Sequence, residues 1–374
     1  MVAAGLLVAL SLVVVGLECR VDATNHDFIC YWSTAKLAVG RKNPYDPAAI
    51  LTLERAAGAH YQDAFVMRNP PWALFLVLPL GWLSIPVAAV LWTFSIVVAA
   101  LASVRLLWPR ARGRIPLLAW FFAPVILCAA AGQTATFLLL GVSLFLHFQA
   151  RRPYAAGVAL LLPAMKPHLF LLFWPVLLLD CWRRRDYRVL AGTCAGLAAA
   201  VAFALCIDVH VWSHYVTMMR TQHPGDEYLP NISIALRGLR PQDWWLQVLP
   251  TAAGVALAMW QRWRQREWDW RREGAMVFAA SVLTAPYSWP TDQALFLPAV
   301  LAGYARASKW GLAVFAALNV LEIVEAARHA PMTAPAYLWT APAWMLWCAY
   351  AYLWPRRARP RSGAVAVDGV LRGA

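Results

Sequence analysis

The chain has 374 residues, of which 61% are hydrophobic and only 14% are charged. Soluble domains are nearer half apolar and about a quarter charged, so this composition excludes an ordinary soluble protein and indicates an integral membrane protein. A formal net charge of +14 would suggest nucleic acid as a partner of a soluble domain. Here the basic residues form short clusters between apolar runs, as in the cytoplasmic loops of membrane proteins, so no nucleic-acid partner is expected.

Apolar segments long enough to cross about 30 Å of hydrocarbon recur along the chain. The first, residues 2–18, has no basic residues before it and no small-residue cleavage site after it, so we expect an uncleaved helix. A long outer loop at 19–71 and an interfacial stretch at 72–80 follow it. The remaining spans are expected at 87–108, 115–131, 134–150, two short arms within 154–181, 188–207, 242–261, 275–288, 292–305, 309–326 and 335–354.

Basic clusters separate these segments, and the positive-inside rule places them in the cytoplasm. The two large polar loops, 19–71 and 208–241, then both lie on the outer face. The sequence therefore predicts an all-α membrane protein of roughly 10–13 transmembrane helices, with one polytopic domain over 1–355 and a disordered basic cytoplasmic tail over 356–374. The clusters are Arg105 to Arg114, Arg151 with Arg152, Arg183 to Arg188, Arg262 to Arg272, Arg306 with Lys309, and Arg356 to Arg361.

The first outer loop begins with a carboxylate beside the membrane. Asp27 follows the first predicted helix, and Tyr31, Ala35 and Ala38 recur after it at helical spacing. This spacing predicts an amphipathic helix along the membrane interface. A carboxylate held there is partly desolvated, which makes it a better proton acceptor. The alternative is that Asp27 only caps a helix, since Asp is a favoured N-cap residue.

A second candidate is Lys166, which stands between two short apolar arms with His168 beside it. A charge at membrane depth is costly and usually functional. Pro167 ends the helix there and frees backbone groups to line a cavity. The alternative is that Lys166 extends its ammonium group to the outer interface.

Several short motifs, in order, resemble the membrane glycosyltransferases of the GT-C superfamily, specifically glycosyltransferase family 87. The first outer loop carries the longest motif, from Asp27 and Tyr31 to the Pro44-Tyr45-Asp46-Pro47 run. Together the motifs span residues 27 to 292, most of the chain. The others are Asn69-Pro70-Pro71, Gly132-Gln133, Gly157, Lys166-Pro167, Asn231-Ile232-Ser233 and Ala285-Pro286-Tyr287-Ser288-Trp289.

The resemblance implies an inverting glycosyltransferase, with mannose as the default sugar and a polyprenyl-phosphate-linked donor. Asp27 matches the family's catalytic base, and Lys166 is the candidate cation for the leaving phosphate. No cofactor and no metal are expected, because no cluster of metal-ligating residues is visible in the sequence. The acceptor would be a lipid or glycan, and the site would face outward from the cytoplasmic membrane among membrane lipids. Further candidate substrate-binding residues are Tyr31, Tyr45, Gln133, His168, Asn231, Trp289 and Asp292.

One position departs from the family's pattern. Histidines that meet the carrier phosphate commonly follow the S-W pair in this family, whereas Thr291 and Asp292 stand here. A carboxylate repels phosphate unless it is paired with Lys166 or an arginine. Asp292 would otherwise hold sugar hydroxyls, or would only cap the next helix.

Two other functions remain open from the sequence. A transporter or flippase of lipid-linked intermediates would also have many spans and an intramembrane lysine, although no repeat relates the two halves as transporters usually show. A family member retained only as an assembly subunit is the third reading. Loss of function in an Asp27→Asn variant separates the enzyme from the transporter.

Overall fold

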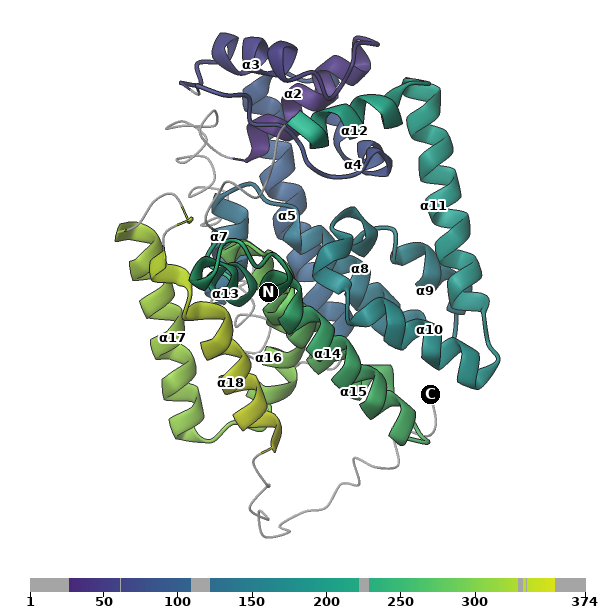
Figure 1. Cartoon of the computed structure of the whole chain (residues 1–374), viewed down its shortest axis with the longest axis vertical. Coiled ribbons are helices and arrows are strands. Elements are labelled where there is room, and N and C mark those ends of the chain that lie inside the picture. The colour runs from purple at the N-terminus through teal and green to yellow at the C-terminus, as the bar shows by residue number, and fades with distance from the viewer. Residues whose placement is uncertain are drawn as a thin grey trace, which may run out of the picture.

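The computed structural model describes residues 27–60, 62–108, 122–221, 229–328, 332–333 and 335–353, and these contain helices and no strand (Figure 1). The predicted first helix at 2–18, the first part of the predicted span at 115–131 and the predicted tail at 356–374 lie outside the described residues. Within the described part, helices α5 (Ile85–Leu107), α11 (Arg188–Ile207) and α17 (Lys309–Arg328) are long and apolar enough to cross a membrane. The prediction of an all-α membrane protein is confirmed.

The long helices expose apolar side chains, as helices in contact with lipid do. Leu91 and Phe94 of α5 are exposed, and so are Val320 and Leu321 of α17. Soluble monomers rarely leave such surfaces open to water. The predicted span at 188–207 coincides with α11, and the one at 87–108 is shifted from α5 by two residues or fewer.

Most other described elements are shorter, and several begin at a proline; α14 (Trp245–Arg264) is as long as α11 but less apolar. The two predicted arms within 154–181 are present, and two short 3₁₀ turns join them around Lys166. The shorter elements are α7 (Ala123–Ala130), α8 (Ala135–Phe148), α9 (Pro153–Ala159), η3 (Pro163–Met165), η4 (Pro167–Phe170), α10 (Phe173–Arg184), α13 (Ile232–Leu239), α15 (Trp270–Thr284), η6 (Pro290–Phe296), α16 (Leu297–Tyr304), η7 (Pro335–Tyr337) and α18 (Thr340–Leu353).

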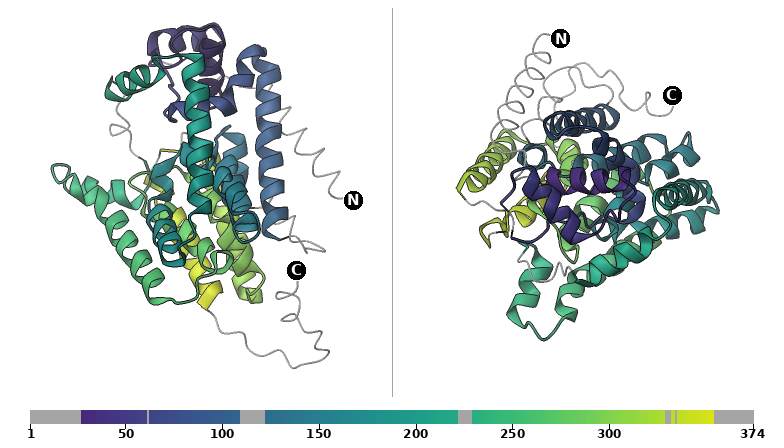
Figure 2. Two further views of the ribbon diagram at one scale, coloured as in Figure 1. Left: turned by 90° about the vertical axis from the view of Figure 1, so that its right-hand side faces the viewer. Right: turned by 90° about the horizontal axis from the view of Figure 1, so that it is seen from above.

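The segment 27–82, which covers most of the predicted first loop and the stretch after it, folds into a cap at one end of the molecule. It contains α2 (Phe28–Val39), α3 (Pro47–Ala56), η1 (Pro71–Ala73), α4 (Leu74–Val77) and η2 (Leu78–Trp82), and α12 (Val211–Thr221) lies beside them (Figures 1 and 2). Helix α3 begins where Asp46 accepts hydrogen bonds from the backbone N–H groups of Ala48 and Ala49, with Pro47 in its first turn, as is typical of a helix start.

The predicted helix after Asp27 is present as α2, but it does not have the exposed polar face of an amphipathic helix. All its side chains except those of Lys36 and Val39 are buried. Helix α2 packs tightly against η2, because a Cβ atom at Gly81 would lie only 2.3 Å from the backbone oxygen of Ala35. Later segments of the chain therefore cover the helix, and its position at the membrane interface stays a prediction.

Close contact between glycine-bearing helices fixes the arm that precedes Lys166. A Cβ atom at Gly157 of α9 would lie 2.0 Å from the carbonyl oxygen of Val189, and one at Gly192 of α11 would lie 2.2 Å from that of Tyr154. Small residues let membrane helices approach backbone to backbone. The short arm α9 is thereby held against the long helix α11.

Candidate active site

A tight turn between α7 and α8 meets the start of α2. The backbone N–H of Asp27 donates to the carbonyl of Ala131 at 3.1 Å, and the indole of Trp92 donates to the carbonyl of Gly132 at 2.7 Å. Gly132 has a φ of +67°, and an added Cβ would lie 2.9 Å from Cβ of Phe28. Only glycine combines this backbone conformation with so close an approach, so the turn fixes where Asp27 stands.

Asp27 is the N-cap residue of α2 by position, but its side chain does not cap the helix. Its carboxylate instead accepts a hydrogen bond from the side-chain amide of Gln133. The interpretation of Asp27 as a mere capping residue is therefore not supported by its contacts. The carboxylate faces a side chain from a different part of the chain.

Gln133 bridges the carboxylate and the candidate cation. Its oxygen Oε1 accepts from Lys166 Nζ at 3.1 Å and from the Tyr31 hydroxyl at 3.4 Å, while its nitrogen Nε2 donates to Asp27. The amide has only one arrangement that satisfies these neighbours, because an ammonium group only donates and a carboxylate only accepts. Asp27, Tyr31, Gln133 and Lys166, all predicted from the sequence, thus come together.

Lys166 also forms an ion pair with Asp292. Its Nζ lies 2.8 Å from Asp292 Oδ1, and the side chains of Lys166 and Asp292 are 11% and 0% exposed. The other carboxylate oxygen of Asp292 accepts from the backbone N–H of Trp289 at 3.0 Å. Asp292 therefore both closes the turn at the start of η6 and pairs with the lysine.

The second outer loop reaches the same turn through Asn231. Its side chain donates to the Ser288 hydroxyl at 2.8 Å and accepts from the backbone N–H of Ser233 at 2.7 Å, which starts α13. His168 stacks on Tyr287 of this turn, with ring centroids 3.9 Å apart. Trp289 is partly buried beside them. The structure thus gathers His168, Asn231 and Trp289 around the 287–292 turn.

Tyr45 holds the backbone next to Lys166 in place through Asn69. The Tyr45 hydroxyl donates to the Asn69 carbonyl at 3.1 Å, and the Asn69 side chain donates to the carbonyl of Met165 at 3.0 Å. The Trp72 indole donates to the neighbouring carbonyl of Ala164 at 3.1 Å. The sequence analysis did not assign Asn69 to the site, although it noted the Asn69-Pro70-Pro71 motif.

Arg68 is a second residue near the site that was not predicted from the sequence. Burial raises the pKa of the Cys30 thiol of α2, and the positive charge of Arg68 opposes that rise. The Arg68 carbonyl accepts from the Tyr215 hydroxyl of α12 at 3.3 Å. This arginine matters for the charge balance, since the network otherwise contains Asp27 and Asp292 against Lys166 alone.

A buried carboxyl supports the segment that leads to Arg68. Glu54 at the end of α3 is fully buried, and its Oε2 accepts from the backbone N–H of Phe65 at 3.1 Å. Its Oε1 has no hydrogen-bond partner among the described residues. Burial raises the pKa of Glu54 to about 7, because a desolvated carboxylate is disfavoured.

Among the described residues, no group of three or more His, Cys, Asp and Glu side chains is placed to hold a metal ion. The polar groups that the site does bring together are a carboxylate, an ammonium group and a bridging amide. These groups suit proton acceptance and stabilisation of a negative leaving group.

Comparison with known protein families gives a match over more than half of the chain. Residues 67–286 match the family model described as "Glycosyltransferase family 87". No curated protein matches the chain, and no solved structure matches it.

Proposed function

The chain belongs to glycosyltransferase family 87, and from this premise we propose that it transfers a sugar, mannose by default, from a polyprenyl-phosphate donor to a lipid or glycan acceptor. The reaction would invert the anomeric centre and take place at the outer face of the cytoplasmic membrane. The observation that carries the proposal is the continuous polar path from Asp27 through Gln133 and Lys166 to Asp292.

Asp27 is the proposed general base. The acceptor hydroxyl gives its proton to the Asp27 carboxylate while its oxygen attacks the anomeric carbon from the side opposite the phosphate. The bond between that carbon and the phosphate oxygen breaks, and its electron pair stays on polyprenyl phosphate. General-base assistance of this kind contributes about 10²–10⁴-fold to the rate.

Lys166 is the proposed partner of the leaving phosphate. The phosphodiester of the donor gains one negative charge when the sugar departs, so a fixed cation lowers the energy of the transition state more than that of the ground state. Asp292 and Gln133 hold the ammonium group in position before substrate arrives. Arg68 adds positive charge nearby, which offsets the carboxylate that stands where the family commonly has histidines.

The test is donor consumption by the full-length protein in nanodiscs. Wild-type protein is supplied with a panel of polyprenyl-phosphate sugars and crude lipid acceptors, and release of polyprenyl phosphate is measured. Asp27→Asn and Lys166→Ala are compared with Asp186→Asn and Lys309→Ala, which make the same changes at residues outside the network.

Consumption of one donor, lost in the first pair of variants and kept in the control pair, supports the proposal and names the sugar. If no donor is consumed above the level of the two site variants, the transferase proposal is wrong. Lipid transport that persists in Asp27→Asn would then favour the transporter.

A further inference from the structure

Helices α10 and α14 end, and α15 begins, at the end of the molecule opposite α2 and α3 (Figures 1 and 2). Residues at these helix ends line a basic cavity. Its volume is about 380 Å³. It is separate from the candidate active site and shares no residue with it. The lining residues are Arg183, Arg184, Arg262, Arg266, Glu267 and Trp268.

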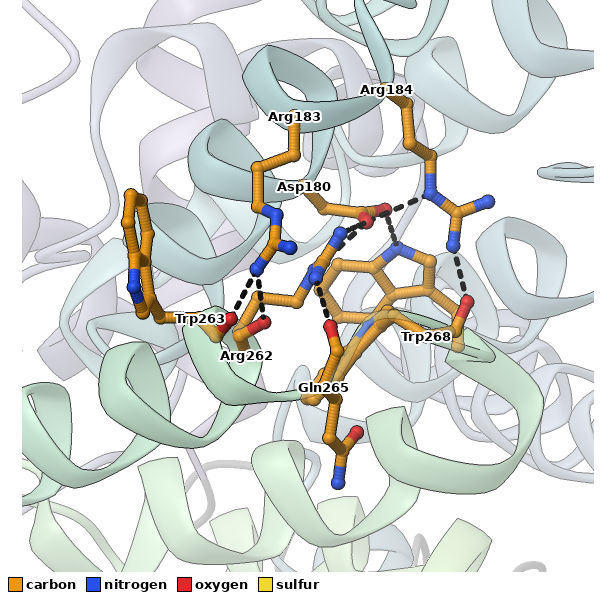
Figure 3. A network of polar contacts seen from close by, with 8 residues as sticks. Asp180, Arg183, Arg184, Arg262, Trp263, Gln265 and Trp268 are labelled. Atoms are coloured by element: carbon orange, nitrogen blue, oxygen red, sulfur yellow. Dashed lines mark hydrogen bonds and ion pairs between the residues drawn. The ribbon is translucent and has the colours of Figure 1, made fainter.

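The wall of this cavity is built on a buried ion pair (Figure 3). Arg262 is 2% exposed, and it donates to Asp180 Oδ1 through Nε at 3.0 Å and Nη2 at 2.6 Å. Asp180 also accepts from Arg184 Nε at 2.8 Å and from the Trp270 indole at 2.7 Å. Because Asp180 accepts four hydrogen bonds in all, it holds the guanidinium groups of Arg262 and Arg184 in place.

Backbone carbonyls also hold the guanidinium groups of Arg183 and Arg184 (Figure 3). Arg183 Nη1 donates to the carbonyls of Arg262 and Trp263, and Arg184 Nη2 donates to that of Trp268. Arginines in a cytoplasmic loop are usually flexible and solvated. These are held in position, so an anion that binds them loses little side-chain entropy.

The charge of the cavity is positive after internal pairing is counted. Four arginines line it, and Glu267 in the lining and Asp180 behind it carry the opposing charges, so four positive and two negative charges leave a net of +2. The carbonyls that hold Arg183 and Arg184 carry no net charge and neutralise none of this. A phosphate group is the ligand that matches fixed guanidinium donors best.

The surroundings indicate that this phosphate belongs to a lipid. Trp182 and Trp263, which are 56% and 58% exposed, stack with ring centroids 6.2 Å apart, and exposed tryptophans at helix ends mark the level of lipid headgroups. Leu178 on α10 and Leu257 on α14 are exposed as well, which provides apolar surface for acyl chains. A soluble phosphate compound would make no contact that explains these exposed apolar side chains.

We propose that this cavity binds the phosphate headgroup of an anionic membrane phospholipid, with its acyl chains along α10 and α14. Basic pockets between membrane helices are a recurrent way to hold such headgroups. Helix α10 continues the arm that carries Lys166, and α15 leads to the turn with Asp292, so the bound lipid would stabilise the elements that position both.

Native mass spectrometry of the full-length protein in detergent tests the proposal, with phosphatidylglycerol and phosphatidylcholine as probes. Arg183→Gln combined with Arg266→Gln removes two lining charges and leaves the Asp180–Arg262 pair intact. Arg264→Gln combined with Arg185→Gln is the matched control, since it removes the same charge from the same segments outside the cavity.

We expect wild-type protein and the control to bind phosphatidylglycerol at least about tenfold more tightly than the cavity variant does, because the variant lacks two guanidinium groups that would donate charge-assisted hydrogen bonds to the phosphate. The proposal would be overturned if the control variant lost as much affinity for phosphatidylglycerol as the cavity variant does. It would also be overturned if the wild-type protein bound phosphatidylcholine as tightly as phosphatidylglycerol. Glycerol phosphate or inorganic phosphate that displaces the lipid at millimolar concentration would show a site for soluble phosphate and would also overturn it.

Discussion

Two buried ion pairs lie toward opposite ends of this protein, and their surroundings differ. Lys166–Asp292 has one direct contact of 2.8 Å, and its other partner, Gln133, leads on to a second carboxylate. Arg262–Asp180 is closed by four hydrogen bonds on the carboxylate. In the first arrangement, polar groups remain that can exchange their present partners for a substrate. In the second, the ion pair holds α10 and α14 together, and the arginines that line the cavity present a surplus of positive charge to the outside.

Substitution of Asp27, which Gln133 links to the Lys166–Asp292 pair, should have the largest effect on turnover. We expect Asp27→Asn to lower kcat by about 10²–10⁴-fold while the donor KM changes little, because the acceptor hydroxyl loses its base and the phosphate contacts remain. Release of polyprenyl phosphate measures both constants. Asp186→Asn makes the same change in an exposed pair and should leave kcat within about threefold; an equal loss in both variants would mean that the loss is not specific to Asp27.

The second pair should affect stability most. Asp180→Ala leaves Arg262 buried without its carboxylate, and breaking a buried pair in this way costs about 3–5 kcal/mol of unfolding free energy. Thermal unfolding in detergent measures the loss. Asp186→Ala is the control, because the Asp186–Arg188 pair is exposed and such pairs contribute about 0–1 kcal/mol. If the two substitutions lowered the unfolding free energy by similar amounts, the Asp180–Arg262 pair would have to be accessible to water.

The pH dependence of stability should also differ between the two ends of the molecule, because Glu54 lies at the end that carries α2 and α3. Its folded pKa of about 7 lies above the ordinary value of 4.5, so the folded state binds more protons than the unfolded state between these values. The part of the stability that depends on Glu54 should therefore be fully present below about pH 4.5 and be lost as the pH rises through 7, by on the order of 3 kcal/mol.

Unfolding midpoints measured from pH 5 to 8 test this prediction. Glu54→Gln should flatten the profile over this range, whereas Glu267→Gln, at the opposite end and exposed, should leave the slope unchanged. A wild-type profile without this slope would place Glu54 in a more polar environment than its contacts indicate.

The sequence predicted the long elements well because the length of an apolar run is a direct physical constraint. The prediction for 188–207 coincides with α11. It did not show what surrounds α2, because helical spacing of apolar residues does not show whether lipid or protein covers them. Gly81, some forty residues later, lets η2 pack onto Ala35, and no local pattern indicates that contact.

Within the candidate site, the sequence identified most members but not their contacts. Asp27, Gln133, Lys166 and Asp292 were each chosen from local context or family resemblance, and their meeting depends on turns far apart in the chain. Burial of Arg262 was not predicted, because the positive-inside pattern already explained every arginine in its cluster. A charge paired with a partner 82 positions away looks like any other loop charge in a sequence.

The smallest expected effect concerns the amide that links base and cation. Gln133→Leu keeps the approximate volume but removes the hydrogen bonds to Asp27 and Lys166, and bonds to charged groups contribute about 1.5–3 kcal/mol each. We expect kcat/KM to fall about tenfold, less than for Asp27→Asn, because the base and the cation both remain. Gln149→Leu, just after the other end of α8, is the matched control and should leave kcat/KM unchanged. A loss as large as that of Asp27→Asn would mean that the amide contacts substrate itself, whereas no loss would mean that Asp27 and Lys166 keep their positions without the bridge.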